Sequence, residues 1–560
     1  MLEHWQRALR IATGGEAADL LLRGGQVVNV FTGEVEHGTI AIADGRIVGI
    51  GDYTAAERVV DLDGAFVAPS FIDGHFHTES SLLWITQFAR TVVPHGTGAI
   101  VTDPHEIVNV AGLSGFNALV DASRDLPLAV YFTVPSCVPA SPRETAGAVI
   151  SAGDIAAGLQ NPAAVGLGEM MNFPGVLGGD PEIFARLEAA NGWRKDGHAP
   201  GLTGRALDGY ALSGMTSDHE STSLEEGREK LRRGMMLMIR EGSTEHNLRE
   251  LLPLVNDRTW ARCCFASDDR DCTTLLHDGH MNQTLRLAVS EGLDPIRAIT
   301  MATFNVADYW RLERIGAIAP GYWANLVVLD DLRDFNVREV YWQGQRVAAG
   351  GRPGFDVQTA IPAALRNSVH LPNLRAEMLR IPPEAANQAV GTIDGQIVTT
   401  LLHVEPAIVD GQPVADVERD LLKLVCVERH RATGNVGAGY VKGFGLRRGA
   451  LATSIAHDAH NVVAVGTNDA DILLAIETLA AMQGGLAAVA DGEVLAQLAL
   501  PVAGILSDQP LEATAAGYER MEAVARELGS SLHSPYGLLA FMALSVIPEA
   551  RVTDQGFIVV

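Results

Sequence analysis

The sequence predicts an α/β protein built around a (β/α)8 barrel, with a small split β-sandwich and a C-terminal α/β domain. Two observations lead to this fold class. Eight short apolar runs recur between residues 67 and 311, and stretches with helical character separate them. Each run also closes on a polar or ionisable residue, as barrel strands do at the face that carries active sites.

The length and charge of the chain limit its possible partners. With 560 residues it exceeds the usual size of one hydrophobic core, so we expect several domains. Acidic residues outnumber basic residues by 68 to 42, which argues against nucleic acid or a membrane surface as a partner. The first 20 residues lack the apolar core of a signal peptide, and the five cysteines follow no disulfide or zinc-ribbon spacing. We therefore expect a cytoplasmic protein.

The two ends of the chain differ from its middle in composition and in the spacing of apolar runs and turns. Residues 1–66 are predicted to hold a leader and the first part of a β-sandwich, because short β-branched runs alternate there with Gly-Gly, Thr-Gly and Asp-Gly turns. Residues 312–360 repeat this pattern, so we expect them to complete the same β structure around the insert 67–311. Residues 361–560 are rich in glycine and alanine and predict the C-terminal α/β domain.

The insert supplies the strands of the predicted barrel. Its apolar runs are FVAPSFIDGHFH, GAIVTDPHE, LAVYFTVPS, AAVGLGEMM, GWRKDGHAP, ALSGMTSDHE, RGMMLMIREGS and ARCCFASDD. Continuous apolar strands that alternate with helices are typically parallel strands joined by crossover helices. Eight such units over this length fit a (β/α)8 barrel, although the fifth and sixth runs are only weakly apolar.

The first run carries two histidines one residue apart. In a strand, side chains alternate between the faces, so Asp73, His75 and His77 would share one face. Neutral imidazole is a common ligand of zinc, manganese and iron. On its own, however, so short a pattern is more often a polar strand end with solvated histidines.

Further candidate ligands stand at the ends of the other runs. In chain order the set is His75, His77, Asp103, His105, Glu169, His198, His219 and Asp268. Because the carboxyl ends of barrel strands meet at one mouth, we expect these side chains to converge. Imidazole and carboxylate ligands then predict a metal site. No metalloprotease helix and no cytidine-deaminase zinc motif accompanies them.

A resemblance to a known family becomes specific at this point. The order H-x-H, Glu, His, His, Asp resembles the amidohydrolase superfamily. More narrowly, PSFIDGHFHTESSL, HGTGAIVTDPHEIVNVAG, GEMMNFPGV, GHAPGLTGRALDGY and ERHRATGNVGAGYVKGFGLRRGALATSIAHDAHN resemble the adenine deaminase family, and the similarity runs from about residue 20 to the end. Ser70 stands where that family usually has glycine, which is not a ligand position.

The resemblance implies a metal-dependent hydrolase that converts free adenine to hypoxanthine and ammonia. A metal-bound hydroxide would attack C6, because a metal lowers the pKa of bound water to about neutral. The alternative is an amidohydrolase reaction on a different aminopurine or a cyclic amide. Two divalent ions are implied, with manganese expected and iron or zinc as alternatives. We also expect a homodimer.

The resemblance assigns most of these ligands to two ions. His75 and His77 would hold the first ion, and His198 and His219 the second, with Glu169 bridging or flanking them. Asp268 would bind the first ion and carry a proton from the attacking water to the leaving nitrogen.

Several roles stay open from the residues alone. Glu169 is the first candidate for protonating the purine at N1, but two cations would keep it ionised. The other acids to consider are Glu79, Glu106 and Asp103. Asp269 could accept a hydrogen bond from a purine nitrogen or pair with Arg270, and Asp103 with His105 could bind a further ion or order a loop. His457, Asp458 and His460 could be ligands, a lid over the mouth or a hydrogen-bonded turn.

Overall fold

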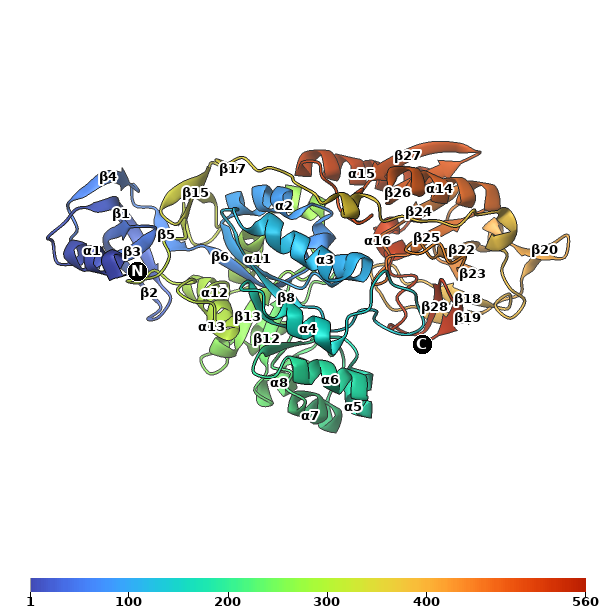
Figure 1. The fold of residues 1–560 in the computed structure, drawn as a ribbon, viewed down its shortest axis with the longest axis horizontal. Helices are drawn as coiled ribbons and strands as arrows, with labels where there is room; N and C mark the ends of the chain where they lie inside the picture. Colours follow the sequence, from blue (N-terminus) through green and yellow to red (C-terminus); the bar gives the residue numbers. More distant parts are fainter. Residues whose placement is uncertain (1) are drawn as a thin grey trace.

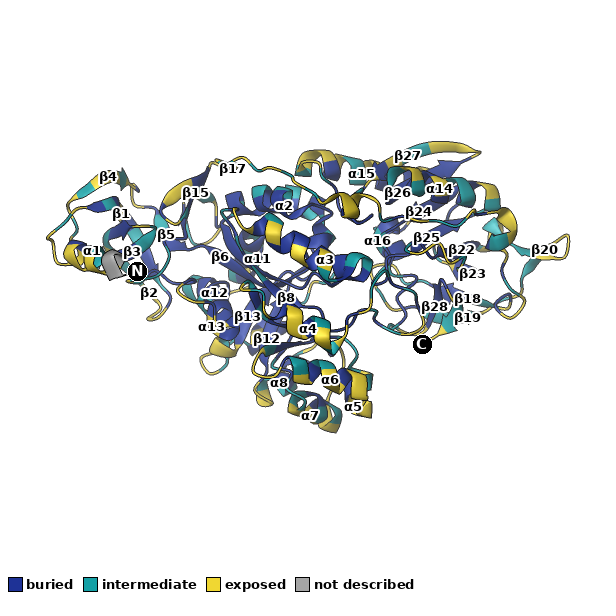
Figure 2. Ribbon diagram, viewed as in Figure 1, coloured by how far each residue is buried: buried dark blue, intermediate teal, exposed yellow. Residues whose placement is uncertain are grey.

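The computed structural model describes residues 2–560. Three sheet-containing regions follow one another along its long axis, from the amino-terminal region at one end to the C-terminal region at the other (Figure 1). Buried residues concentrate in the strands, whereas exposed residues lie on the outer faces of the helices (Figure 2). None of the helices within the described residues combines the length and apolarity needed to cross a membrane.

The amino-terminal sheet is assembled from two distant segments. It contains β1 (Ala18–Asn29), β2 (Glu34–Ala43), β3 (Arg46–Gly51), β4 (Ala56–Asp61), β5 (Phe66–Pro69), β14 (Leu326–Leu329), β15 (Val337–Trp342), β16 (Gln345–Ala349) and β17 (Arg352–Pro353). The segments join where β5 pairs antiparallel with β14, Phe66 opposite Leu329. Helix α1 (Leu2–Ala12) packs beside β3. Asp44 and Gly45 form the β2–β3 turn with positive φ at both positions, as a tight hairpin requires.

The central region contains a strand at each of the eight apolar runs. A five-stranded parallel sheet holds β6 (Phe71–Phe76), β7 (Thr97–Thr102), β8 (Ala129–Val134), β9 (Ala164–Met170) and β10 (Arg194–Gly197). A three-stranded parallel sheet holds β11 (Ser217–Asp218), β12 (Met236–Arg240) and β13 (Cys263–Ala266). The two strands from the weakly apolar runs are short: β10 has four residues, as β13 does, and β11 has two.

Hydrogen bonds link these two sheets at both of their edges. Between β10 and β11, the Thr216 amide donates to the Lys195 carbonyl at 3.1 Å. Between β13 and β6, the Asp268 amide donates to the His75 carbonyl at 3.0 Å, and the His77 amide donates to the Asp268 carbonyl at 2.9 Å. The last strand of the region therefore lies beside the first.

Helices follow the central strands along the chain. They are α2 (Ile85–Val92), α3 (His105–Ser123), α4 (Ala152–Gly158), α5 (Phe173–Gly178), α6 (Pro181–Ala189), α7 (Gly204–Leu212), α8 (Leu224–Arg232), α9 (Leu248–Leu251), α10 (Cys272–His277), α11 (Met281–Ser290), α12 (Pro295–Met301) and α13 (Phe304–Trp310). Local sequence fixes several of their starts. Ser151 and Asp154 form a capping box at α4, and the Ser223 side chain accepts from the Glu226 amide at α8.

The C-terminal region is an eight-stranded sheet covered by helices. Its strands, in spatial order, are β19 (Thr400–His403), β18 (Gln388–Gly391), β23 (Val436–Lys442), β22 (Leu421–Val427), β25 (Val462–Gly466), β24 (Ala450–Thr453), β26 (Gly485–Ala490) and β27 (Glu493–Ala499). Helices α14 (Asp469–Met482), α15 (Leu511–Glu527) and α16 (Pro535–Ala540) accompany it, with hairpins β20 (Ala407–Val409) to β21 (Gln412–Val414) and β28 (Ala550–Thr553) to β29 (Gly556–Val559). Strand β22 is buried along its whole length, because its alternate residues join different apolar cores.

The central and C-terminal regions are joined by backbone hydrogen bonds near the carboxyl end of β6. The Ser507 amide donates to the Leu82 carbonyl at 2.7 Å, and the Trp84 amide donates to the Ser507 carbonyl at 2.9 Å. These bonds fix the C-terminal region over the loops that follow the central strands.

Candidate metal centre and the cavity beside it

The carboxyl ends of β6 and β13 bring two histidines against one carboxylate. Asp268 Oδ1 lies 3.3 Å from His75 Nε2 and 3.0 Å from His77 Nε2, and the two imidazole nitrogens are 3.1 Å apart. Asp268 has a positive φ of 59°, a conformation that aspartate tolerates better than most residues. This turn directly after β13 places its side chain at the same strand ends as the histidines.

Glu169, near the carboxyl end of β9, lies between these groups and a second histidine pair. Its Oε1 is 3.3 Å from His77 Nε2. Its Oε2 contacts His198 Nδ1 and lies 3.2 Å from His219 Nε2. The structure therefore brings together six predicted ligands from five different strands, although more than 190 residues separate the first from the last in the chain.

Asp103 and His105, which follow β7, lie next to this group. Asp103 Oδ2 accepts a hydrogen bond from the Glu169 amide at 2.8 Å, and His105 Nδ1 is 3.4 Å from Glu169 Oε1. The approach of Asp103 depends on Gly168, because a Cβ there would lie 2.2 Å from Asp103 Oδ2. Asp103 and His105 thus contact the Glu169 side of the centre.

Three further residues, Asp196, Glu220 and Arg240, contact the site, although none of them was among the predicted site residues. His75 Nδ1 pairs with Asp196 Oδ2 at 2.7 Å, an arrangement that fixes the orientation of the imidazole. Arg240 Nη1 lies 2.7 Å from Asp268 Oδ2 and 2.5 Å from Glu220 Oε1. The available sequence signal was an ionisable residue that ends or interrupts a strand: Asp196 in RKDG and Arg240 after MLMI.

The electrostatics of the centre favour positive charge. Burial lowers the pKa of His75 and His77, but Asp196, Glu169 and Asp268 outweigh it and hold these pKa values well above the usual range. Burial raises the pKa of Glu169 and Asp268, yet the surrounding histidines hold both well below the usual carboxyl value. A buried group of carboxylates that stays ionised in this way is a suitable environment for cations.

The donor set also fits a metal ion. Both ring nitrogens of the fully buried His219 lack a hydrogen-bond partner within the described part of the chain, as do His105 Nδ1 and Asp103 Oδ1. Buried polar atoms normally have a hydrogen-bond partner, because a buried polar atom without a hydrogen bond costs about 1–3 kcal/mol of stability. Nitrogen and carboxylate ligands that lie within 4.8 Å of one another include His75, His77 and Glu169, and also Glu169, His198 and His219. A metal ion bound to His219 would satisfy one of its two ring nitrogens.

The remaining predicted residues lie at the edge of the centre. Asp269 Oδ1 accepts from Ser80 Oγ, whereas Arg270 donates to the carbonyl oxygens of Gly279 and His280, so the expected alternative of an Asp269–Arg270 pair is not what forms. Glu79 Oε1 accepts from an amide of α3 at 3.1 Å, and burial raises the pKa of Glu79 to about 7.

The His457 segment reaches this edge from the C-terminal region. Both His457 Nδ1 and His460 Nε2 contact the carboxylate of Glu106. Asp458 is buried and approaches His105, with 4.0 Å between Asp458 Oδ1 and His105 Nε2. The segment thus pairs with the first turn of α3, which follows β7.

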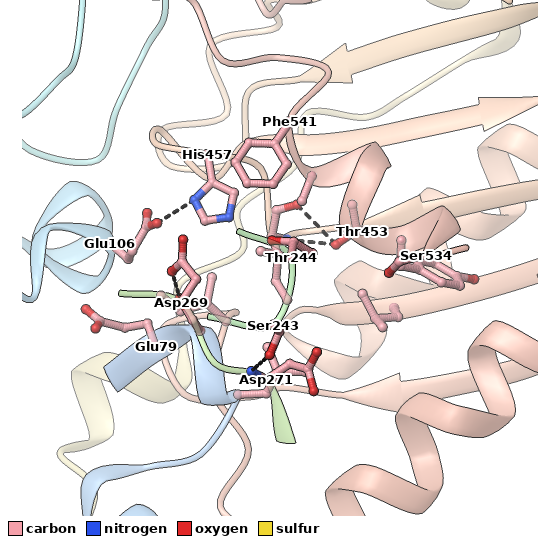
Figure 3. A pocket seen from close by; sticks show the side chains of 18 of the residues that line it. Glu79, Glu106, Ser243, Thr244, Asp269, Asp271, Thr453, His457, Ser534 and Phe541 are labelled. Atoms are coloured by element: carbon pink, nitrogen blue, oxygen red, sulfur yellow. Dashed lines mark hydrogen bonds and ion pairs between the residues drawn. The ribbon is translucent and has the colours of Figure 1, made fainter. Parts of the chain in front are cut away.

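A cavity of about 120 Å³ opens beside the candidate metal centre. Glu79, Glu106 and Asp269 line it from the central region, and His457 and Phe541 line it from the C-terminal region. Figure 3 shows the three carboxylates on one side, with the His457 and Phe541 rings next to each other. Asp269 directly follows Asp268 in the chain, so the cavity adjoins the candidate ligands.

Comparison with known proteins assigns the family. Residues 66–347 match the amidohydrolase family, and residues 396–560 match the adenine deaminase C-terminal domain. The chain is 48% identical over 559 residues to an adenine deaminase of Dehalococcoides mccartyi, covering 100% of this chain and 98% of that protein. The chain belongs to the adenine deaminase family. Adenine deaminase 2 of Carboxydothermus hydrogenoformans is 44% identical over 552 residues, with coverage of 98% and 97%.

The adenine deaminase match includes both sides of the cavity. The amidohydrolase segment contains the histidine pairs with Glu169 and Asp268, and the adenine deaminase C-terminal segment contains His457 and Phe541. Among solved structures, a β-aspartyl dipeptidase of Fervidobacterium islandicum has a TM-score of 0.47 at 14% identity, over 62% of this chain and 100% of that one.

Proposed function

We propose that this member of the adenine deaminase family hydrolyses free adenine to hypoxanthine and ammonia. The observation that carries the reaction type is the convergence of two histidine pairs on Glu169 and Asp268. The substrate is supported by the similarity over the whole chain to proteins named adenine deaminase.

We propose that His75, His77 and Asp268 hold one divalent ion and that His198 and His219 hold a second, with Glu169 between them. Manganese is the ion we propose, and iron or zinc would accept the same ligands. Bound there, the ions would lower the pKa of a water molecule and so supply the nucleophile at neutral pH. A cytoplasmic homodimer is part of the same proposal.

Asp268 is proposed to carry the proton. Its Oδ1 faces both His75 and His77, while Arg240 holds its Oδ2 at 2.7 Å. Arg240 thereby fixes the carboxylate in one orientation, with Oδ1 on the side of the histidines. Asp268 can then accept the proton of the attacking water and deliver it to the exocyclic nitrogen, which leaves as ammonia.

Protonation at N1 of the purine requires a different acid. Glu169 lies among four imidazoles, so we propose Glu79 for this role on the basis of its position. It lines the cavity beside the centre, and its Oε2 has no hydrogen-bond partner within the described residues. A base bound in the cavity would provide that partner.

We further propose that the two central sheets form one closed (β/α)8 barrel over residues 67–311. The hydrogen bonds at both seams support this closure. Residues 1–66 and 312–360 would then form the split β-sandwich and residues 361–560 the C-terminal α/β domain. The carboxyl ends of barrel strands carry the reactive groups, in agreement with the placement of the histidines.

The test is a direct assay of the metal-replete protein. Ammonia release and the ultraviolet change from adenine to hypoxanthine should appear together, in proportion to the measured metal content. Other aminopurines and cyclic amides should react far more slowly. If one of these compounds reacts faster than adenine, that compound is the substrate and the alternative amidohydrolase reaction is favoured.

A further inference from the structure

Two regions of the chain build the cavity beside the candidate metal centre, and the C-terminal region supplies more of its lining residues than the central region. The segments that directly follow β6, β7, β12 and β13, including the first turn of α3, form one wall. The segment after β24 and helices α15 and α16 with the residues next to them form the opposite wall. A ligand in this cavity would therefore contact the C-terminal region directly.

The two walls differ in chemistry. The central wall presents the carboxylates of Glu79, Glu106 and Asp269. The C-terminal wall presents apolar and aromatic side chains, among them Ile455, Leu486, Tyr518, Tyr536 and Phe541. A flat molecule with hydrogen-bonding edges and apolar faces is complementary to this combination, and a free purine base has that character.

Phe541 is the aromatic residue best placed to contact such a face. Its neighbours Ala540 and Met542 are buried, whereas Phe541 remains half-buried and lines the cavity. Its ring stacks on the His457 imidazole, with 4.5 Å between ring centroids and 13° between the ring planes. Figure 3 shows this ring pair beside the cavity carboxylates.

The ring pair is held in place from the opposite wall. His457 Nδ1 contacts Glu106, the second residue of α3, and Glu106 also contacts His460. One carboxylate of the central region therefore fixes the imidazole on which Phe541 rests. A fixed aromatic surface loses little conformational freedom when a ligand stacks on it.

We propose that Phe541, backed by the His457 ring, is a specificity-determining residue that stacks on the heteroaromatic base of the substrate. This inference rests on the proposed function, and it assigns the C-terminal region a direct part in substrate selection. Stacking against an aromatic side chain depends on a planar π face, so saturated cyclic amides would gain less from this contact than purines.

The test compares substitutions of Phe541 in the full-length, manganese-loaded enzyme. We expect Phe541→Ala to raise the KM for adenine and the Kd for hypoxanthine by roughly 10- to 100-fold, in the range of base-stacking contributions measured by alanine substitution. The value of kcat should change by less than about threefold, because Phe541 is not among the ligands or proton carriers. Phe541→Leu keeps an apolar side chain without the π face and should show an intermediate loss.

Phe557→Ala provides the matched control. Phe557 lies on β29 in the same region and outside the lining of the cavity. That variant should keep the parent KM and Kd, and all variants should keep the parent metal content. If Phe541→Ala does not fold, Phe541→Leu decides the question alone.

The outcomes separate this inference from the proposed function. A parent enzyme that neither deaminates adenine nor binds hypoxanthine would contradict the function itself. A parent enzyme that does both, together with Phe541 variants whose KM and Kd equal the parent values, would overturn only the role of Phe541.

Discussion

At the scale of single residues, Asp268 combines an unusual backbone conformation with contacts to three charged or ionisable groups. We expect Asp268→Asn to reduce kcat/KM by about 10³-fold or more, because asparagine tolerates the same positive φ but cannot accept the proton. Circular dichroism should show a folded chain, and the adenine assay measures the loss. Asp257→Asn removes an exposed carboxylate paired with Arg297 and should retain the parent rate. An unchanged rate in Asp268→Asn would mean that another group carries the proton.

Glu522 on α15 lies outside the candidate metal centre, and its ionisation should make the stability of the protein depend on pH. Burial raises its pKa to about 7 from an ordinary value of 4.5. Between these pH values the folded chain holds a proton that the unfolded chain has lost, so stability falls as the pH rises from about 4.5 to about 7. Glu522→Gln should therefore raise the free energy of unfolding by about 1–2 kcal/mol at pH 8.

Calorimetry at two pH values tests the Glu522 prediction. The advantage of Glu522→Gln should disappear well below pH 4.5, where the parent carboxyl is protonated in both the folded and the unfolded state. A variant with the parent Tm at pH 8 would show that the buried Glu522 carboxylate does not lower the free energy of unfolding. The difference between variant and parent at each pH cancels effects that both proteins share.

Residue types could predict the ligands but not their supporting partners. The H-x-H pair and the ionisable residues at run ends indicated a convergent group, and the structure brings them together. Asp196 escaped notice because its partner His75 is 121 positions away, and nothing local distinguishes a paired aspartate from a solvated one. The role of Arg240 is likewise visible only from its contacts with Asp268 and Glu220, which the sequence does not show.

At the scale of elements, apolar continuity predicted the strands well and their lengths poorly. Strands occur at all eight runs, but β11 has only two residues. Its neighbour β10 carries Lys195 and Asp196, and the buried Asp196 carboxylate is satisfied by the tertiary partners Ser217 and His75. A strand that supplies functional groups contains more polar residues, so its sequence is less apolar and the strand is harder to predict.

Strand β9 offers a test of how an element positions a functional side chain. Gly168→Ala should push the Asp103 carboxylate away from the Glu169 amide, because the new Cβ would lie 2.2 Å from Asp103 Oδ2. Loss of that buried hydrogen bond should cost about 1–3 kcal/mol. Thermal unfolding and metal analysis measure the effect, and both Tm and metal content should fall. Gly178→Ala in α5 is the control, since its Cβ would meet nothing within 4 Å.

At the scale of the whole molecule, the metal centre should contribute to global stability. Ions that bind only the folded chain stabilise it by about 4 kcal/mol at 1,000 times their Kd. Chelation should therefore lower Tm, and added manganese should restore it. His219→Gln removes a fully buried candidate ligand, and added manganese should raise the Tm of this variant much less than that of the parent. A Tm that is the same with and without chelator would contradict a centre that binds metal in the folded chain.

The division of the amino-terminal sheet between two distant segments has a consequence for biosynthesis. Strand β5 can pair with β14 only after β14 has been synthesised. The ribosome adds roughly 250 residues between the two strands, which takes about 13–50 s at ~5–20 residues per second. During that interval one edge of β5 on the nascent chain has no strand beside it, and open edges recruit other chains. Dense polysomes would bring such edges together, so chaperone supply during overexpression should govern the soluble yield.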